Sequence, residues 1–161
     1  MFLCIGTYYY CPLDCAVMDY PEFPNSEEYT QISDVLKGKS GKSVKIRGWI
    51  YRTRSSGKLA FIIVRDSTGI IQCTVSKGKV EEIDFDKARK ALIESSVLIE
   101  GEPVKDDRAP GGWEIRASKF EVFHFAETFP ITKDQSDEHL LNNRHLWLRS
   151  RNMVASLKIR S

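Results

Sequence analysis

Apolar and polar residues alternate along several segments of residues 44–125, with the period of two that is typical of half-buried β-strands. In the segment LAFIIVRDSTGIIQCTV (59–75), two apolar runs flank a short polar stretch. Ser67 and Thr68, followed by Gly69, predict a tight hairpin turn between these runs. A change of phase near Ser118 predicts a β-bulge in the last strand. Strands are predicted over 44–52, 58–66, 69–75, 95–104 and 113–125.

The segment between the third and fourth strands has the pattern of a helix. Residues 80–93 have early acidic and late basic residues, and their apolar positions recur with roughly helical spacing at Val80, Ile83, Ala88, Ala91 and Leu92. Three strands, a helix and two strands predict a mainly β fold: a five-stranded OB-fold barrel with a helix between strands 3 and 4. Residues 25–43 are expected to be a polar lead-in, and 53–57 (TRSSG) a loop.

The character of the chain changes after Phe125. A proline-containing linker precedes two predicted helical stretches, 134–143 and 151–161. Met153, Val154, Leu157 and Ile159 give the last stretch an amphipathic pattern without a stop signal, so we expect the chain to be cut rather than finished. Residues 1–29 are expected to form a disordered leader, 30–127 the barrel, and 128–161 a hinge with a C-terminal helical segment.

The hairpin pattern also predicts which side chains share a face. If Asp66 faces Gly69, the barrel interior receives Ile62, Val64, Ile71 and Cys73. The outer face then carries Phe61, Ile63, Gln72 and Thr74. The outer face of strands 2 and 3 is where OB-folds bind oligonucleotides, so Phe61 is a candidate for base stacking and Gln72 for hydrogen bonding to a base edge. The alternative is a Phe covered by a loop and a Gln that only keeps the face polar, and a slip of one residue would place Gln72 inside.

The net charge of +2 conceals a strong asymmetry along the chain. Residues 1–36 contain six acidic residues and no Lys or Arg, whereas 37–65 contain nine basic residues and no acidic one. Trp49, Tyr51 and Phe61 lie among these basic residues, which favours a polyanion with stackable groups, hence a nucleic acid. A solvated, Lys-rich edge strand is the alternative.

These residues carry a family resemblance. The segment VKIRGWIYRTRSSGKLAFIIVRDSTGIIQCTV (44–75) resembles the anticodon-binding domain of the aspartyl/asparaginyl-tRNA synthetases, which are class II enzymes. APGGWEI (109–115) is similar to that family's loop before the fifth strand. FPITKDQSDEHLLNNRHLWLRSR (129–151) resembles the hinge and the approach to the first class II motif, and its FPIT and RHLWLRS runs favour the asparaginyl branch. By this resemblance, 30–127 is the anticodon-binding domain and 128–161 the hinge and truncated start of the catalytic domain.

The resemblance implies roles for individual residues. Phe61 would stack on the middle anticodon base, a uridine, and Gln72 would contact the edge of that base. Glu114 would accept hydrogen bonds from the guanine at the first anticodon position, although it could instead pair with Arg116 or Arg108.

Three basic residues complete the predicted nucleic-acid-binding set. By the resemblance, Arg54 would contact the anticodon backbone or bases, although it could be a solvated loop residue. Arg47 and Lys58 are candidate phosphate partners on charge alone.

The family's catalytic motifs are missing before Ser161. The chain alone is therefore expected to be inactive in aminoacylation and to hold no cofactor, whereas the full-length family uses ATP and Mg²⁺. It would be a fragment of an asparagine–tRNA ligase or a truncated gene product. The implied partner is the asparagine tRNA anticodon loop, and the implied compartment is the cytoplasm. The full-length family is homodimeric; this chain is expected to be a monomer or a weak dimer.

Two other functions stay open from the sequence. One is a free-standing OB module that binds single-stranded DNA or RNA without sequence choice. The other is an interaction domain that dimerises through 151–161. Cys11 and Cys15 have the spacing of half a zinc site, but no second pair follows, so no metal is expected and free thiols in a reducing compartment are the simplest interpretation.

Overall fold

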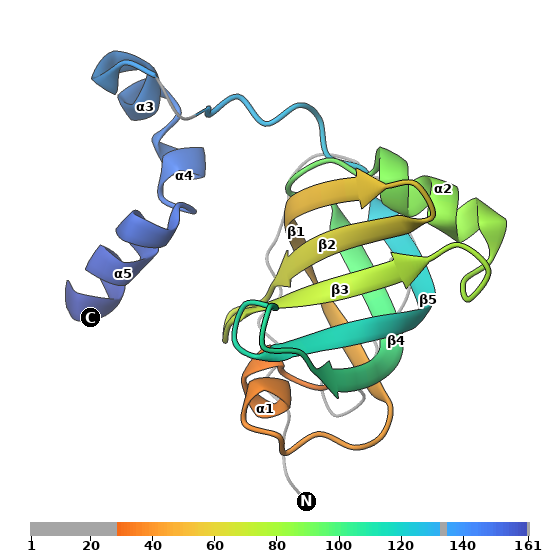
Figure 1. The fold of residues 1–161 in the computed structure, drawn as a ribbon. Helices are drawn as coiled ribbons and strands as arrows, with labels where there is room; N and C mark the ends of the chain where they lie inside the picture. Colours follow the sequence, from red (N-terminus) through yellow and green to blue (C-terminus); the bar gives the residue numbers. More distant parts are fainter. Residues whose placement is uncertain (1–28, 133–134, 161) are drawn as a thin grey trace, which may run out of the picture.

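The fold is a closed five-stranded β-barrel with strand order β1-β2-β3-β5-β4 (Figure 1). The computed structural model describes residues 29–132 and 135–160, so the predicted leader and the Cys11–Cys15 pair lie outside the described residues. Strands β3 and β5 are parallel, and the other neighbours are antiparallel. The strands are β1 (Val44–Ser56), β2 (Leu59–Arg65), β3 (Ile70–Ser76), β4 (Ser96–Lys105) and β5 (Trp113–His124). Helix α2 (Glu82–Lys90) lies between β3 and β4 in the chain, which confirms the predicted OB-fold.

The β2–β3 hairpin has the predicted register. Ile63 pairs with Gln72 and Phe61 with Thr74. Asp66 shapes the turn, because its Oδ1 accepts hydrogen bonds from the backbone N–H groups of Thr68 (2.6 Å) and Gly69 (2.8 Å). The four side chains predicted for the interior, Ile62, Val64, Ile71 and Cys73, are all fully buried. The faces of the hairpin are therefore as predicted from its alternation.

Strand β1 is longer than predicted. The segment expected to be a loop, 53–57, continues the strand through Ser56, and Ser56 pairs with Leu59 across a turn at Gly57 and Lys58. Barrel closure explains this length, because the first half of β1 pairs with β4 and its second half pairs with β2. Thr and Ser residues that suit a turn in isolation here continue the pairing of β1 with β2, and β3 pairs with the other side of β2 over the same length.

The predicted bulge in β5 is confirmed. Glu100 pairs with Lys119 and Gly101 pairs with Ala117, so Ser118 is the extra residue. A second shift of register, between Ser96 and Val97, was not predicted. Both shifts increase the twist that β4 and β5 need to close the barrel.

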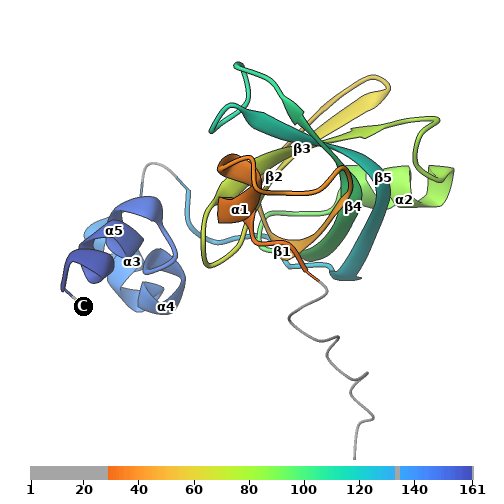
Figure 2. The ribbon, with the colours of Figure 1, turned by 90° about the horizontal axis from the view of Figure 1, so that it is seen from below.

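A short helix, α1 (Ile32–Leu36), lies within the stretch expected to be a polar lead-in. Ile32 and Val35 are fully buried, and the N–H of Ile32 donates to Asp66 Oδ2 over 2.9 Å. The helix lies across one end of the barrel (Figure 2). Five residues are too few to show a helical period, which is why the sequence pattern missed it.

Helix α2 (Glu82–Lys90) buries a different face from the one expected. Phe85 and Ala88 are buried, whereas Ile83 is 68% exposed and Leu92 is 45% exposed. The predicted apolar face is therefore wrong at Ile83 and Leu92. Phe85, rather than either of them, fills the core, and the helix ends before Leu92.

Three short helices follow the barrel: α3 (Asp137–Asn142), α4 (Arg144–Trp147) and α5 (Arg151–Arg160). The helical stretches predicted over 134–143 and 151–161 contain α3 and α5, whereas α4 was not predicted; Asn143, with non-helical backbone angles, separates α4 from α3. We call α3, α4 and α5 the arm; it stands beside the barrel rather than covering one of its faces (Figure 1). Within residues 29–132 and 135–160, no helix has the length and apolar character needed to cross a membrane.

Candidate nucleic-acid interface

The outward side chains of four neighbouring strands form two parallel rows. Strand pairing aligns the first row as Arg54, Phe61, Thr74 and Arg116, from β1, β2, β3 and β5. It aligns the second row as Arg52, Ile63, Gln72 and Glu114 from the same strands. We call the two rows the outer face. It brings together four of the predicted site residues: Phe61, Gln72, Glu114 and Arg54.

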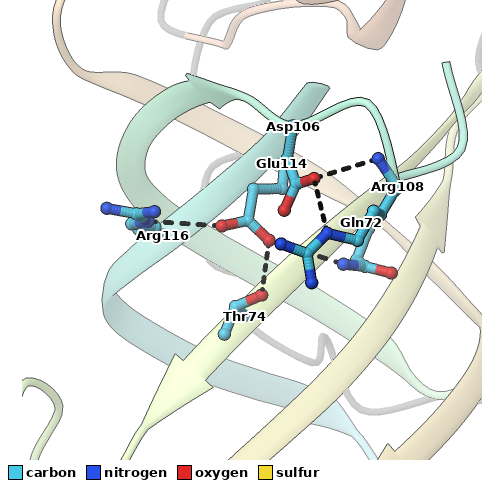
Figure 3. Close-up of polar contacts among 6 residues, drawn as sticks. All are labelled: Gln72, Thr74, Asp106, Arg108, Glu114 and Arg116. Carbon is cyan, nitrogen blue, oxygen red and sulfur yellow. Dashed lines mark hydrogen bonds and ion pairs between the residues drawn. The ribbon is translucent and has the colours of Figure 1, made fainter. Parts of the chain in front are cut away.

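Glu114 is the polar centre of the outer face (Figure 3). Its Oε2 accepts hydrogen bonds from Thr74 Oγ1 (3.0 Å) and Gln72 Nε2 (3.4 Å), and its Oε1 accepts one from Arg116 Nε (3.2 Å). The side chain is only 8% exposed, although it lies on the outside of the barrel. Three donors from two strands therefore hold the carboxylate in one orientation.

The ion pair between Glu114 and Arg116 was one of the two predicted alternatives for Glu114. The other partner, Arg108, instead contacts Asp106, with Nε 3.9 Å from Oδ1, and its side chain is 96% exposed. Arg108 lies in the β4–β5 loop, where Asp106 Oδ1 also accepts from the backbone N–H of Arg108 (Figure 3). The loop thus places an exposed cation at the edge of the outer face.

The chemistry of these groups suits the edges of bases. A carboxylate only accepts hydrogen bonds, and an amide both donates and accepts. Gln72 uses one N–H toward Glu114, and an amide has a second N–H and a carbonyl oxygen to offer. Side by side, Gln72 and Glu114 therefore present an ordered set of donors and acceptors to an unstacked base.

Phe61 and Arg54 form a second unit of the outer face. The Arg54 guanidinium lies 5.2 Å from the centre of the Phe61 ring, in cation–π range. Arg54 lies on β1 directly opposite Phe61 and not in a loop, because the strand continues past the predicted end. A half-buried ring with a cation beside it is suited to stacking on a base and neutralising a nearby phosphate.

The other two predicted residues lie outside the outer face. Arg47 belongs to the half of β1 that pairs with β4, opposite Leu98, and its guanidinium stacks on Tyr29 at 4.7 Å. Lys58 lies at the exposed tip of the β1–β2 turn. Arg47 is separated from Arg52 and Arg54 because its part of β1 pairs with β4, whereas theirs pairs with β2; a count along the sequence does not reveal this division of the strand.

Sequence reasoning missed two basic residues of this surface. Arg52 lies in the second row, and Arg89 of α2 lines a small pocket of about 20 Å³ together with Arg54 and Phe61. The late basic residues of α2 were interpreted only as complementing the helix dipole. No local signal links Arg89 to Phe61, because tertiary packing brings α2 against β2.

Cys73 lies directly beneath the outer face, between Gln72 and Thr74 on β3. It is fully buried, and burial, followed by the negative charge of Glu114, raises the pKa of its thiol well above the usual range. No group of three or more potential metal ligands occurs in the part of the chain that the structure describes. The outer face therefore offers hydrogen bonding, stacking and positive charge.

Comparison with known proteins agrees with this geometry. Residues 44–123 match the model of the OB-fold nucleic acid binding domain family. The chain is 52% identical over 125 residues to the asparagine–tRNA ligase of Thermoplasma acidophilum, covering 78% of this chain and 29% of that protein. It is 48% identical over 128 residues to the asparagine–tRNA ligase of Thermococcus kodakarensis, covering 80% of this chain and 30% of the relative.

A solved structure of an asparaginyl-tRNA synthetase is also similar to this chain. The asparaginyl-tRNA synthetase of Pyrococcus horikoshii, solved with asparaginyl-adenylate, superposes with a TM-score of 0.75 at 41% identity, covering 82% of this chain and 31% of that one. The chain thus spans about three tenths of the length of these relatives, in their N-terminal part.

Proposed function

Because the chain belongs to the OB-fold nucleic acid binding domain family and matches the N-terminal part of asparagine–tRNA ligases, we propose that its outer face binds the anticodon loop of asparagine tRNA. The single observation that carries the proposal is the polar group on β3 and β5. Gln72 and Glu114 lie on adjacent strands in hydrogen-bond contact, on the same face as Phe61.

Each residue of the outer face has a distinct role in the proposal. Phe61 stacks on the middle base, a uridine, and Gln72 bonds to the edge of that base, which carries one N–H donor and two carbonyl acceptors. Glu114 accepts from the guanine at the first anticodon position, whose N–H groups suit a carboxylate.

The basic residues hold the backbone of the loop. Arg54 lies beside Phe61 and neutralises a phosphate next to the stacked base. Lys58 and Arg47 lie outside the outer face, so in this proposal they add sequence-independent attraction to more distant phosphates. Affinity should therefore depend on salt through all three cations, whereas discrimination between bases should depend on Gln72 and Glu114.

The proposal assigns this chain the recognition step of a tRNA ligase. The resemblance implies ATP and Mg²⁺ for aminoacylation by the full-length family, and the motifs of that chemistry do not occur before Ser161. We propose binding without aminoacylation for the chain alone, and the cytoplasm as its compartment. A weak dimer is the expected limit of self-association.

A titration with three ligands of equal length tests the proposal. They are an anticodon stem-loop with the sequence GUU, the same stem-loop with its middle uridine replaced, and a single-stranded DNA. We expect the GUU stem-loop to bind at least about tenfold more tightly than the other two, because a lost base contact typically costs 1–3 kcal/mol. Equal affinities that change only with salt would instead indicate a general single-strand binder.

A further inference from the structure

Glu94 has an unusual backbone conformation in the turn between α2 and β4. Its φ is 72°, in the left-handed region that disfavours residues other than glycine. The backbone N–H of Glu94 donates to the carbonyl of Ile50 over 2.7 Å, which holds the turn against β1. Since glycine would adopt this conformation more easily, the side chain of Glu94 is the feature that a glycine would lose.

The carboxylate of Glu94 joins the barrel to the arm. Arg65 on β2 donates from Nη2 to both Glu94 oxygens, at 2.6 and 2.7 Å. Arg149, between α4 and α5, donates from Nη1 to Glu94 Oε2 at 2.9 Å, and Arg65 Nη1 donates to the Arg149 carbonyl at 2.9 Å. The Glu94 and Arg65 side chains are only 11% and 16% exposed, so their ion pair is far less screened than a surface pair, whereas Arg149 is 40% exposed and its ion pair is screened more. We call Arg65, Glu94 and Arg149 the hinge cluster.

The next residue in the turn holds the other end of the connecting segment. Ser95 is fully buried, and its Oγ accepts a hydrogen bond from the backbone N–H of Ala126 over 3.0 Å. Ser95 thus binds Ala126, where the chain leaves the barrel, and the adjacent Glu94 binds Arg149, where the arm comes back into contact with the barrel.

The remaining contact around the hinge cluster is loosely packed. A cavity of about 210 Å³ separates the barrel from the arm beside the hinge cluster. Its apolar lining comes from Tyr51 and Ile93 of the barrel, Phe129 and Ile131 of the connecting segment, and Leu146 and Trp147 of the arm. Elsewhere the arm stands apart from the barrel (Figure 1), so the hinge cluster provides most of the directional contact.

We propose that Glu94 is a positioning residue that fixes the arm relative to the outer face. Arg65 lies on the outward side of β2, in the same alternation as Phe61 and Ile63. The strand that carries the stacking ring at one end therefore carries the attachment of the arm at its other end. This inference rests on the proposed function only where it names the outer face as the nucleotide-binding surface; the attachment itself is independent of any ligand.

Backbone ¹⁵N relaxation of the whole chain tests the attachment. In the unaltered protein, amides of α4 and α5 should report the same rotational correlation time as amides of the barrel strands. In Glu94→Gln and Glu94→Gly, the correlation time of the arm should fall to roughly half while that of the barrel is unchanged. The matched control is Glu82→Gln, which removes the exposed ion pair with Lys77 and should leave both values unchanged.

The thermal midpoint of each variant shows whether Glu94 positions the arm or is needed for the barrel to fold. Both variants leave Arg65 without its partner, but Glu94→Gly also removes an unfavourable φ, so its thermal midpoint should be higher than that of Glu94→Gln even though the arm is released in both. An arm that moves independently in the unaltered protein, or that stays coupled in both Glu94 variants, would overturn the inference.

Binding to the GUU stem-loop distinguishes this inference from the proposed function. Each Glu94 variant should bind the stem-loop within about twofold of the unaltered chain, because its outer face is intact. If the unaltered chain failed to prefer GUU but relaxation showed the predicted release, the proposed function would fail and the attachment would stand. A Glu94 variant that lost stem-loop binding while its arm stayed coupled would contradict the positioning role.

Discussion

Gln72 Nε2 lies 3.4 Å from Glu114 Oε2, across the parallel strands β3 and β5. The barrel pairs these two strands directly, although 42 residues of sequence separate Gln72 from Glu114. The pairing fixes the backbone positions from which the amide and the carboxylate extend, and the hydrogen bonds to Glu114 hold its carboxylate in place. Preorganisation of this kind lowers the entropy that a flexible loop would lose on binding a base.

A carboxylate in place of the Gln72 amide should destabilise the fold at neutral pH. The carboxylate introduced by Gln72→Glu would lie against Glu114, and the mutual repulsion should raise the pKa of one of the two carboxyls above its unfolded value. The penalty is then present above that raised pKa and is relieved as the pH falls below it. We expect a loss of about 1–2 kcal/mol in unfolding free energy at pH 7 and a smaller loss at pH 4.5.

Urea unfolding at the two pH values measures this difference, with Gln72→Met as the uncharged control of similar length. A deficit of Gln72→Glu that is the same at both pH values would show that the two side chains do not approach each other as described.

Removal of the Phe61 ring should weaken stem-loop binding without changing its dependence on salt. Stacking of a base on an aromatic ring typically contributes 1–3 kcal/mol, so Phe61→Ala should lower affinity about fivefold to a hundredfold. Phe123→Ala is the control, because Phe123 is 60% exposed and lies at the end of β5, outside the outer face. Fluorescence anisotropy with a labelled stem-loop gives both values, and equal losses in the two variants would remove Phe61 from the binding surface.

Alanine should destabilise the fold to different extents at Gly48 on β1 and at Gly57 in the β1–β2 turn. A Cβ on Gly48 would overlap the carbonyl oxygen of Arg65 and would lie 2.8 Å from Val64 Cγ1. Gly57 has open space around it, but its φ is +57°. Gly48→Ala should therefore cost about 2–3 kcal/mol through steric displacement, and Gly57→Ala about 1 kcal/mol through backbone strain alone.

Chemical denaturation of both variants ranks the two effects. A Gly48→Ala protein as stable as Gly57→Ala would contradict the close approach of β1 and β2 at Arg65.

The Cys73 thiol should resist modification in the native state. Because burial and the Glu114 charge raise its pKa, the reactive thiolate is scarce at pH 8 and has no access to solvent. Peptide mass spectrometry after brief iodoacetamide treatment should find Cys73 unlabelled in buffer and labelled in urea. Labelling in buffer at a rate similar to that in urea would mean that the barrel opens readily at β3.

The features that depend on a local pattern of side chains could be predicted from the sequence. The alternation in β2 and β3, with a turn held by Asp66, placed Phe61 and Gln72 on the outer face and Cys73 inside. The bulge at Ser118 followed from a break in the same alternation. These features depend on side chains only a few residues apart.

Features that depend on packing between distant segments could not be predicted from the sequence. The five residues of α1 become a helix because Ile32 and Val35 close one end of the barrel. The contact of Glu114 with Thr74 and Gln72 requires the parallel β3–β5 pairing. Arg47 lies outside the outer face because its part of β1 pairs with β4, a strand that is distant in the sequence.

The most direct test of anticodon recognition is a double-mutant cycle between Gln72 and the middle uridine. Affinities are measured for the unaltered chain and Gln72→Met, each with the GUU stem-loop and with a stem-loop in which cytidine replaces that uridine. We predict that the uridine-to-cytidine change weakens binding about tenfold in the unaltered chain and less than about twofold in Gln72→Met, because a base contact is worth 1–3 kcal/mol. Equal effects of the base change in both proteins would contradict the assignment of Gln72 to the middle anticodon base.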